Sequence, residues 1–365
     1  MKTLAIIGAH GIPAKYGGYC TLAEYLAEYK PEDFDITVYC VKSEYKERPE
    51  MYKGAHLVYV DLPARGMNAW KFHLWCLKDA LSKGIECMLL CGSNSGFFLP
   101  FFHKHKSKFY LNIGGIEWQR NKYNWVMRNV VRLLMRTAVS NSAHLIADNV
   151  GMQDYYVEEY GRNDSVMIPY GGDQAKRAEV TKEAISKYPF LDKKFAIAIA
   201  RIQSDNNTEM LLEAFKDAKM PLVYIGNWDV TPWAKETREN YSKYSNLFLL
   251  DAIYDIPVLN QIRSNCALYV HGHSAGGTNP SLVEAMHLGV PLACFDNKFN
   301  NYTTHDKALY FKNVEDLTNI VENTSEERLN TIARDMKELA IKHYRWETIA
   351  AQYYDFFRNS RNSCN

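Results

Sequence analysis

Residues 267–286 read ALYVHGHSAGGTNPSLVEAM, and this stretch decides the fold class. It opens with a short apolar run, passes through a loop of glycine, serine, threonine and asparagine, and takes up a helical pattern after Pro280. A strand, a glycine-rich loop and a helix in this order are typical of parallel α/β sheets. Backbone N–H groups at the start of such a helix bind anions, and loop hydroxyls add further donors. The stretch therefore predicts a site for phosphate and sugar oxygens at the end of a parallel strand.

The same alternation of strand and helix repeats along the chain. In the first half, strands are predicted at 3–8, 36–41, 56–60, 86–91, 109–113 and 144–148. After a polar stretch near Gly172 a second series follows, with strands at 195–200, 221–225, 247–250, 267–270 and 291–295. Two series of this kind predict two parallel α/β domains, at 1–172 and 173–345. Ligands of such sheets bind beyond the carboxyl ends of the strands, so two facing domains would react their substrates in the cleft.

Composition fits a two-domain globular protein of 365 residues. The net charge of +1 provides no general attraction for nucleic acid, and no run of apolar residues is long enough for a signal peptide or a membrane span. The eight cysteines do not form a zinc-like spacing with histidines. We therefore expect a cytoplasmic protein with reduced thiols, no structural metal and a disordered tail at 361–365.

The first predicted strand ends in a glycine loop, Gly8–Gly18, that precedes a helix. Glycines at this position let backbone N–H groups approach an anion. The spacing is not the G-x-G-x-x-G pattern of dinucleotide binding, which leaves NAD as a weak alternative. A tight turn without any ligand explains the same glycines.

Two charged residues stand out beside the predicted loops of the second domain. Arg201 follows a strand, where its guanidinium could neutralise a diphosphate, and Glu284 lies in the first turns of the helix after Pro280, where it could accept two ribose hydroxyls. The alternatives are a surface pair between Arg201 and Asp205 and a carboxylate that merely complements the helix dipole. His271 and His273 lie two apart on a strand end, so they should alternate faces and not share a metal. The Asp33–Asp35 triplet precedes a strand and is interpreted as chance.

Taken together, these motifs resemble retaining family 4 glycosyltransferases of GT-B fold, and in particular the bacterial rhamnosyltransferase-like branch that builds cell-surface polysaccharide. The resemblance spans nearly the whole chain. The motifs that carry it are 11–18 (GIPAKYGG), 115–120 (GIEWQR), 168–171 (IPYG), Ala200-Arg201 with Asn206-Asn207, and 271–285.

The resemblance implies a role for each motif. Arg201 and Glu284 would act in catalysis, on the diphosphate and the ribose. The residues implied in donor binding are Gly17, Gly18, Asn206, Asn207, Gly277, Thr278, Asn279 and Ser281. Tyr16, Glu117, Trp118 and Arg120 would line the acceptor side.

Departures from the general family pattern concern charge. The acidic residue eight before Glu284 is replaced by Gly276, and the lysine five after Arg201 by Asn206, both as in the rhamnosyltransferase-like branch. The branch's Phe-Glu after the first glycine loop is Tyr19-Cys20 here, which bears on the identity of the sugar or the acceptor.

The implied activity is sugar transfer with retention, from a nucleotide sugar such as dTDP-L-rhamnose to a saccharide or polyprenyl-diphosphate-linked acceptor. No metal or other cofactor is expected, because Arg201 and loop N–H groups would stabilise the leaving diphosphate. Glu117 is the first candidate if a protein base exists. A GT-B-like sugar-nucleotide epimerase and a non-catalytic nucleotide-sugar or polysaccharide-binding protein are the alternatives.

Two further segments carry expectations about partners and packing. Residues 97–108 mix phenylalanines with basic residues, and Arg128, Arg132 and Arg136 recur along a predicted helix, which favours peripheral contact with the inner face of the cell membrane. An ordinary solvated helix face gives the same pattern. The last helix, in 346–365, is expected to pack back on the N-terminal domain, where it could set cleft closure or serve only in packing.

Overall fold

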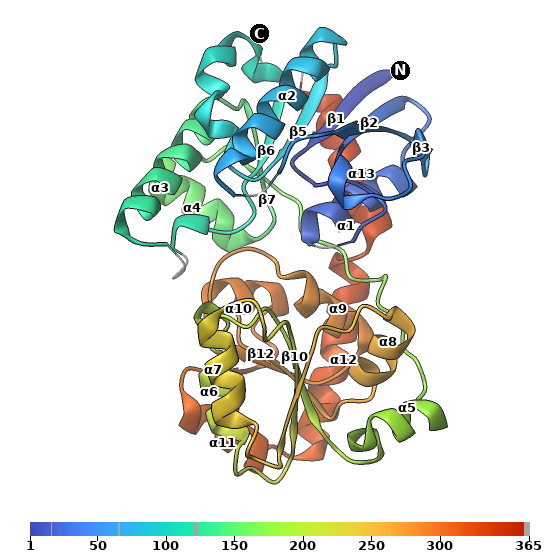
Figure 1. Cartoon of the computed structure of the whole chain (residues 1–365), viewed down its shortest axis with the longest axis vertical. Helices are drawn as coiled ribbons and strands as arrows, with labels where there is room; N and C mark the ends of the chain where they lie inside the picture. The colour runs from blue at the N-terminus through green and yellow to red at the C-terminus, as the bar shows by residue number, and fades with distance from the viewer. Residues whose placement is uncertain (16, 65, 120–122, 361–365) are drawn as a thin grey trace. The chain divides into compact units, whose positions relative to one another are not determined.

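A computed structural model describes the chain except for residues 16, 65, 120–122 and 361–365 (Figure 1). The chain divides into two compact units. The first comprises Met1–Tyr170 together with Trp346–Asn365, and the second comprises Gly171–Arg345. The predicted disorder of the tail at 361–365 falls outside the described residues.

The first unit is built on an eight-stranded sheet with the order β3-β4-β2-β1-β5-β6-β7-β8. All neighbours are parallel except β3 and β4, which form an antiparallel pair. Apolar side chains fill the central strands because both faces of a parallel sheet are covered by helices. The strands are β1 (Lys2–Ile7), β2 (Phe34–Val41), β3 (Met51–Tyr52), β4 (Ala55–Val60), β5 (Cys87–Cys91), β6 (Phe109–Asn112), β7 (His144–Ala147) and β8 (Val166–Met167).

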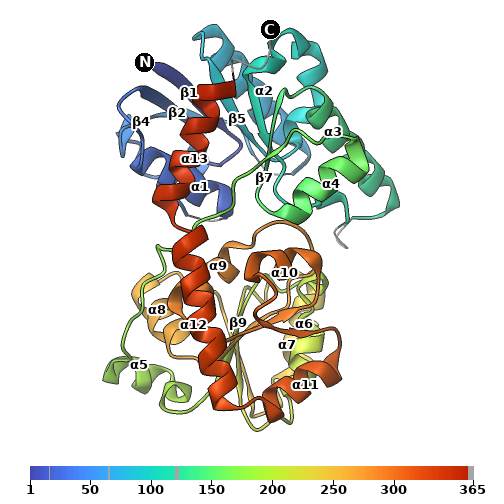
Figure 2. The ribbon, with the colours of Figure 1, turned by 180° about the vertical axis from the view of Figure 1, so that it is seen from behind.

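Helices cover both faces of this sheet, and the last one comes from the far end of the sequence. The α-helices are α1 (Gly18–Glu28), α2 (Ala69–Ser82), α3 (Trp125–Ser140), α4 (Val150–Tyr160) and α13 (Trp346–Asn359), and the 3-10 helices are η1 (Lys42–Glu44), η2 (Gly66–Asn68), η3 (Asn94–Phe97), η4 (Leu99–Lys108) and η5 (Glu117–Gln119). Helix α13 lies beside α1 (Figure 2). The rings of Trp346 and Tyr25 stack with centroids 4.8 Å apart, and Tyr353, Tyr354 and Phe357 are buried in the same core. The C-terminal helix is thus part of the first unit.

The second unit contains a six-stranded parallel sheet with the order β11-β10-β9-β12-β13-β14. Its strands are β9 (Ala196–Ile199), β10 (Leu222–Ile225), β11 (Leu247–Leu250), β12 (Leu268–His271), β13 (Leu292–Phe295) and β14 (Leu309–Phe311). Its helices are α5 (Lys182–Lys187), η6 (Pro189–Asp192), η7 (Ser204–Asn206), α6 (Thr208–Phe215), α7 (Pro232–Tyr241), α8 (Ile256–Ser264), α9 (Pro280–Leu288), α10 (Lys298–Thr304), α11 (Val314–Asn323) and α12 (Glu326–His343). Counted within the unit, the strand order is 3-2-1-4-5-6, the doubly wound Rossmann order.

The units divide after Tyr170, two residues before the predicted boundary at 172. Gly172 belongs to the second unit because its N–H donates to the carbonyl of Tyr344 at 2.9 Å. A Cβ on Gly172 would lie 2.6 Å from the carbonyl oxygen of Val283, so only glycine fits this approach to α9.

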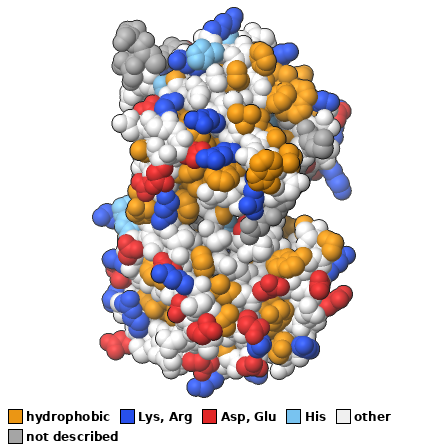
Figure 3. All heavy atoms as spheres, turned by 90° about the vertical axis from the view of Figure 1, so that its left-hand side faces the viewer, with side chains coloured by type: hydrophobic (Ala, Val, Ile, Leu, Met, Phe, Trp, Pro, Cys, Tyr) orange, Lys and Arg blue, Asp and Glu red, His pale blue; other side chains and the backbone are white. Residues whose placement is uncertain are grey.

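The surface of the first unit exposes several large apolar side chains, which gather in the upper part of the face drawn in Figure 3 with Lys and Arg side chains between them. Those on α3, η3 and η4 will be called the α3 surface: Phe97, Phe101, Trp125, Val126, Met127, Val130 and Leu133. In the described part of the chain, no helix combines the length and the apolar character needed to cross a membrane.

Candidate functional site

The strand order of the second unit reverses between β9 and β12, which are hydrogen-bonded neighbours. At such a switch point the loops that follow the two strands run apart on opposite faces of the sheet and leave a crevice for a ligand. The loop after β9 carries Arg201, and the loop after β12 carries residues 272–279. The topology therefore brings the predicted donor-binding motifs of the second unit to one edge of its sheet, whereas Gly17 and Gly18 belong to the first unit.

Hydrogen bonds tie these two loops together. The Asn206 amide donates to the carbonyl of Arg201 at 2.7 Å, and its Oδ1 lies 2.7 Å from Nδ1 of His273. The Asn207 amide donates to the carbonyl of Gly272 at 2.8 Å. The side chains predicted to touch the donor at Asn206 and Asn207 thus bond to neighbouring loops, which makes them supports of the crevice. The Arg201 side chain is exposed at the same edge.

Hydrogen bonds between neighbouring side chains and backbone also fix the N-terminus of α9. Oδ1 of Asn279 accepts from the Ser281 N–H at 3.0 Å and from the Ser281 hydroxyl at 2.9 Å, which is an N-cap, and Pro280 occupies the first turn. Gly277 has φ 86°, a left-handed conformation that suits glycine, and Thr278 is buried. The predicted Asn279 and Ser281 side chains therefore build the turn, and the N–H groups of Ser281, Leu282 and Val283 all donate to Asn279. Backbone donors to an anion would have to come from the loop that precedes the helix.

Glu284 is held by two partners that the sequence did not suggest. Nε2 of Gln174 donates to its Oε1 at 2.6 Å, and Nη1 of Arg263 pairs with its Oε2. The Arg263 side chain is only 7% exposed and also donates to Oδ1 of Asn260 at 3.0 Å. A buried guanidinium on α8 thus fixes the Glu284 carboxylate. The carboxylate therefore has a specific charged partner in addition to the helix dipole. Arg263 and Gln174 are far from Glu284 in sequence and belong to no motif, so no sequence signal pointed to them.

His271 is a buried, neutral histidine at the end of β12. Desolvation, with a smaller contribution from His273, lowers its pKa to about 3, and its buried Nε2 has no hydrogen-bond partner among the described residues. The rings of His271 and His273 lie 6.0 Å apart. Across the described ranges no group of three or more His, Cys, Asp or Glu side chains could hold a metal ion. Metal-independent chemistry stays a prediction.

The buried His271 predicts an acid-sensitive fold. An unfolded histidine takes up a proton near pH 6.5, whereas folded His271 does so only near pH 3, so stability is full above about pH 6.5 and falls as the pH drops through this window. At pH 5 the expected loss from this group is about 2 kcal/mol of unfolding free energy. Urea unfolding at pH 7 and pH 5 measures it. His271→Asn should reduce the loss, and the exposed His103→Asn is the matched control; equal losses in both variants would contradict this assignment.

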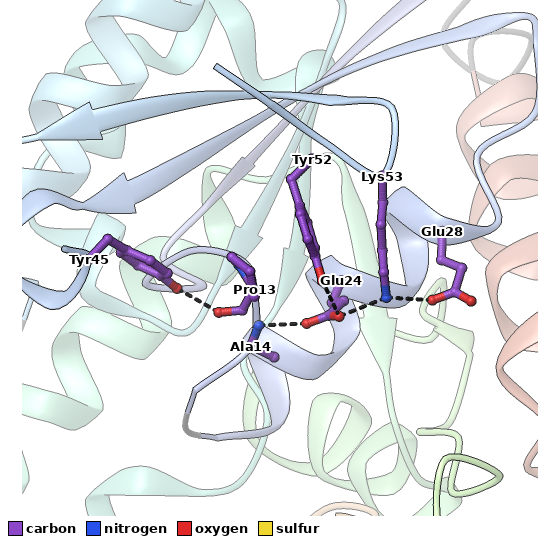
Figure 4. Close-up of polar contacts among 7 residues, drawn as sticks. All are labelled: Pro13, Ala14, Glu24, Glu28, Tyr45, Tyr52 and Lys53. Atoms are coloured by element: carbon purple, nitrogen blue, oxygen red, sulfur yellow. Dashed lines mark hydrogen bonds and ion pairs between the residues drawn. The ribbon is translucent and has the colours of Figure 1, made fainter. Parts of the chain in front are cut away.

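In the first unit, the glycine loop after β1 is anchored from α1 (Figure 4). The Ala14 N–H donates to Oε2 of Glu24 at 2.5 Å, and Lys53 donates to Oε1 of the same carboxylate at 2.7 Å. Gly17 has φ 95° and precedes α1, and a Cβ there would meet nothing within 4 Å. Gly18 begins the helix. The loop therefore has a fixed base and open space at Gly17, whereas Tyr16 lies outside the described residues.

Tyr19 and Cys20, the departure from the branch pattern, both point into the unit. The Cys20 thiol is buried and donates to the carbonyl of Ala9 at 2.6 Å. The Tyr19 hydroxyl donates to the carbonyl of Asn112 at 2.9 Å, and burial raises the pKa of Tyr19 well above its usual value. An acidic side chain at Cys20 would be buried against a carbonyl oxygen, so the thiol suits this interior better than the branch's glutamate.

Apart from Tyr16, the predicted acceptor-side residues follow β6 in the sequence. The Trp118 indole N–H donates to the Tyr155 hydroxyl at 2.8 Å, and the Arg132 guanidinium lies 4.9 Å from the Trp118 ring centroid. Glu117 accepts from the Tyr123 hydroxyl at 3.1 Å. Trp118 thus joins η5 to α3 and α4. The sequence motif did not indicate this packing role. Arg120, also predicted here, lies outside the described residues.

Solved structures with the same architecture identify the fold class. Sucrose-phosphate synthase from Thermosynechococcus elongatus matches with a TM-score of 0.81 and 15% identity over 100% of both chains. The Anabaena protein HepE in complex with UDP matches with a TM-score of 0.71 and 15% identity, over 98% of this chain and 100% of that one. The E. coli trehalose-6-phosphate structure bound with UDP-2-fluoro glucose matches with a TM-score of 0.70 and 12% identity, over 98% and 99%. The chain therefore has the two-domain GT-B fold, as predicted.

Two family models match successive parts of the chain. Residues 180–343 match the family described as Glycosyl transferases group 1, so this part of the chain is a group 1 glycosyltransferase domain. Residues 1–173 match a model described as Domain of unknown function (DUF1972). No curated protein matches the sequence.

Proposed function

We propose that the chain is a retaining family 4 glycosyltransferase of the rhamnosyltransferase-like branch. It transfers L-rhamnose from dTDP-L-rhamnose to a saccharide on a polyprenyl diphosphate, in the cytoplasm, for surface polysaccharide synthesis. The observation that carries the proposal is the Glu284 carboxylate, which buried Arg263 and Gln174 hold beside the capped N-terminus of α9 in a glycosyltransferase domain. A fixed carboxylate suits the sugar hydroxyls of a nucleotide diphosphate, and the positive N-terminal end of a helix suits its phosphates.

In the proposed reaction, the bond between the sugar anomeric carbon and the diphosphate oxygen breaks as the acceptor oxygen attacks from the same face. Negative charge builds on the diphosphate, and the backbone N–H groups of the loop before α9 and the Arg201 guanidinium stabilise it. The leaving phosphate oxygen takes the acceptor proton, so the chain needs no base. Glu284 contributes by fixing the position of the nucleoside, and this places the anomeric carbon for attack.

The solved structures support a nucleotide-sugar donor in general. HepE is described in complex with UDP, with UDP and glucose, and with UDP-glucose. Their identity to this chain is 14% to 15%, so the nucleotide and the sugar are proposed from the motif resemblance and need a direct test.

A product assay distinguishes the proposed reaction from its alternatives. The purified chain is incubated with dTDP-L-rhamnose, UDP-glucose or GDP-mannose and a panel of polyprenyl-diphosphate saccharides, and products are resolved by mass and anomeric NMR. Rhamnosylated lipid with retained configuration supports the proposal. A 2-epimeric sugar nucleotide formed without acceptor would show an epimerase, and donor binding without any turnover would show a binding protein; either result overturns it.

A further inference from the structure

The apolar side chains of the α3 surface are exposed in the part of the unit that the structure describes. The exposed fractions of Trp125, Leu133, Phe97 and Phe101 are 78%, 61%, 58% and 83%. Helix α3 already has a separate core face, formed by Val131, Met135, Ala138 and Val139. The exposed apolar residues are therefore additional to those needed for folding, and side chains of this size rarely gather on a free surface without a binding role.

These residues lie on elements that contact one another. Val126, Val130 and Leu133 recur at spacings of three and four, so they lie on one side of α3. Thr137, one further turn along, donates from its hydroxyl to the carbonyl of Gly96 at 2.8 Å, which places Phe97 of η3 beside this stripe. At the end of the helix, Oδ1 of Asn141 lies 2.9 Å from Nδ1 of His103, which attaches η4 with its exposed Phe101.

The charged side chains carried by α3 and η4 themselves are all basic. Neither α3 nor η4 contains an aspartate or glutamate, whereas Lys104, Lys106 and Arg136 are exposed on them. Arg132 differs from these, because its guanidinium forms two hydrogen bonds to Glu159, at 2.7 and 2.8 Å. Apolar side chains bordered by unbalanced cations match the interface of an anionic lipid bilayer, where rings enter the headgroup region and cations meet lipid phosphates.

We propose that the α3 surface binds the chain peripherally to an anionic phospholipid bilayer. Trp125, Val130, Leu133, Phe97 and Phe101 enter the interface, and Lys104, Lys106 and Arg136 contact the headgroups. The inference deepens the proposed function, since it brings the chain to the membrane that would hold a lipid-linked acceptor. Bilayer binding is measured without donor or acceptor. A failure of the membrane proposal can therefore be distinguished from a failure of the proposed sugar transfer.

The test is co-sedimentation of the whole chain with vesicles of phosphatidylcholine alone or mixed with phosphatidylglycerol. We expect binding to the mixed vesicles that weakens with added salt, and at least tenfold weaker partitioning for the double variant Trp125→Ser, Leu133→Ser. The matched control removes two exposed apolar side chains from the second unit, Tyr254→Ser and Ile256→Ser, and should bind as the wild type does. Arg136→Glu should weaken binding without removing apolar area.

Three results would overturn the proposal. The first is no binding of the wild type to anionic vesicles, and the second is equal binding by the Trp125/Leu133 variant and the control. The third concerns self-association, measured by analytical ultracentrifugation. If the wild type self-associates, and the Trp125/Leu133 variant loses this self-association but still binds vesicles, the α3 surface is a protein interface. Unchanged melting temperatures confirm that the variants are folded.

Discussion

Glu284→Ala is expected to lower kcat/KM by about 30- to 1000-fold, which corresponds to roughly 2 to 4 kcal/mol of transition-state stabilisation. In the proposed reaction this carboxylate holds the nucleoside, so its loss would leave the anomeric carbon of the donor misplaced. The substitution also leaves the Arg263 guanidinium buried without its carboxylate, and an unpaired buried charge destabilises a fold. Steady-state kinetics with the preferred donor, together with melting curves, measure both effects.

The controls for Glu284 separate binding from folding. Glu239→Ala removes an exposed glutamate of α7 and should change neither activity nor stability. Arg263→Met should also lower activity, since Glu284 then loses the group that orients it, and this loss should be larger in KM than in kcat. A tenfold or smaller loss of kcat/KM in Glu284→Ala, at a temperature where the variant is folded, would contradict the assigned role.

Arg201→Ala is expected to cost a similar amount, about 2 to 4 kcal/mol in kcat/KM, but mainly through kcat and with little effect on stability. The side chain is exposed, and the loop is held through the Arg201 carbonyl, which accepts from Asn206 and survives the substitution. In the proposed reaction the guanidinium acts as charge develops on the diphosphate, so its loss should raise the free energy of the transition state. Arg201→Lys should restore part of the rate, because a point charge remains without the bidentate fork.

Single-turnover kinetics with each Arg201 variant measure the chemical step directly. Arg334→Ala, which removes an exposed arginine of α12, is the matched control and should leave the rate unchanged. An Arg201→Ala variant that keeps its rate within tenfold, or one whose rate falls only because it unfolds, would exclude this guanidinium from the reaction.

The α/β architecture could be predicted from sequence because buried parallel strands are nearly continuous apolar runs. The predicted strand at 247–250 coincides with β11, and the one at 36–41 lies within β2. The strands β3, β8 and β14 were missed, since runs of two or three residues show no period. The predicted end of the first domain was late by two residues because Gly171-Gly172 reads as a linker, whereas its packing against Tyr344 and Val283 is a long-range contact.

The sequence indicated where the candidate site lies, but not which hydrogen bonds and ion pairs its residues form. Glycine loops after strands mark the carboxyl edge of a sheet, so residues 272–279 and Arg201 could be placed there from sequence. Which polar atoms remain for a ligand depends on contacts between distant segments. Asn279 and Ser281 satisfy each other in a helix cap, and Glu284 meets a guanidinium from α8. A motif names such residues without showing which of them support the others.

The most direct test of a nucleotide-sugar site in the second unit is a thermal-shift titration of the whole chain with dTDP, UDP, GDP and NAD, each in EDTA. A ligand that binds the folded state raises its melting temperature as its concentration exceeds Kd. We predict stabilisation by dTDP, none by NAD, and loss of the dTDP shift in Glu284→Ala. Stabilisation by NAD alone, or by none of the four ligands, would contradict the account.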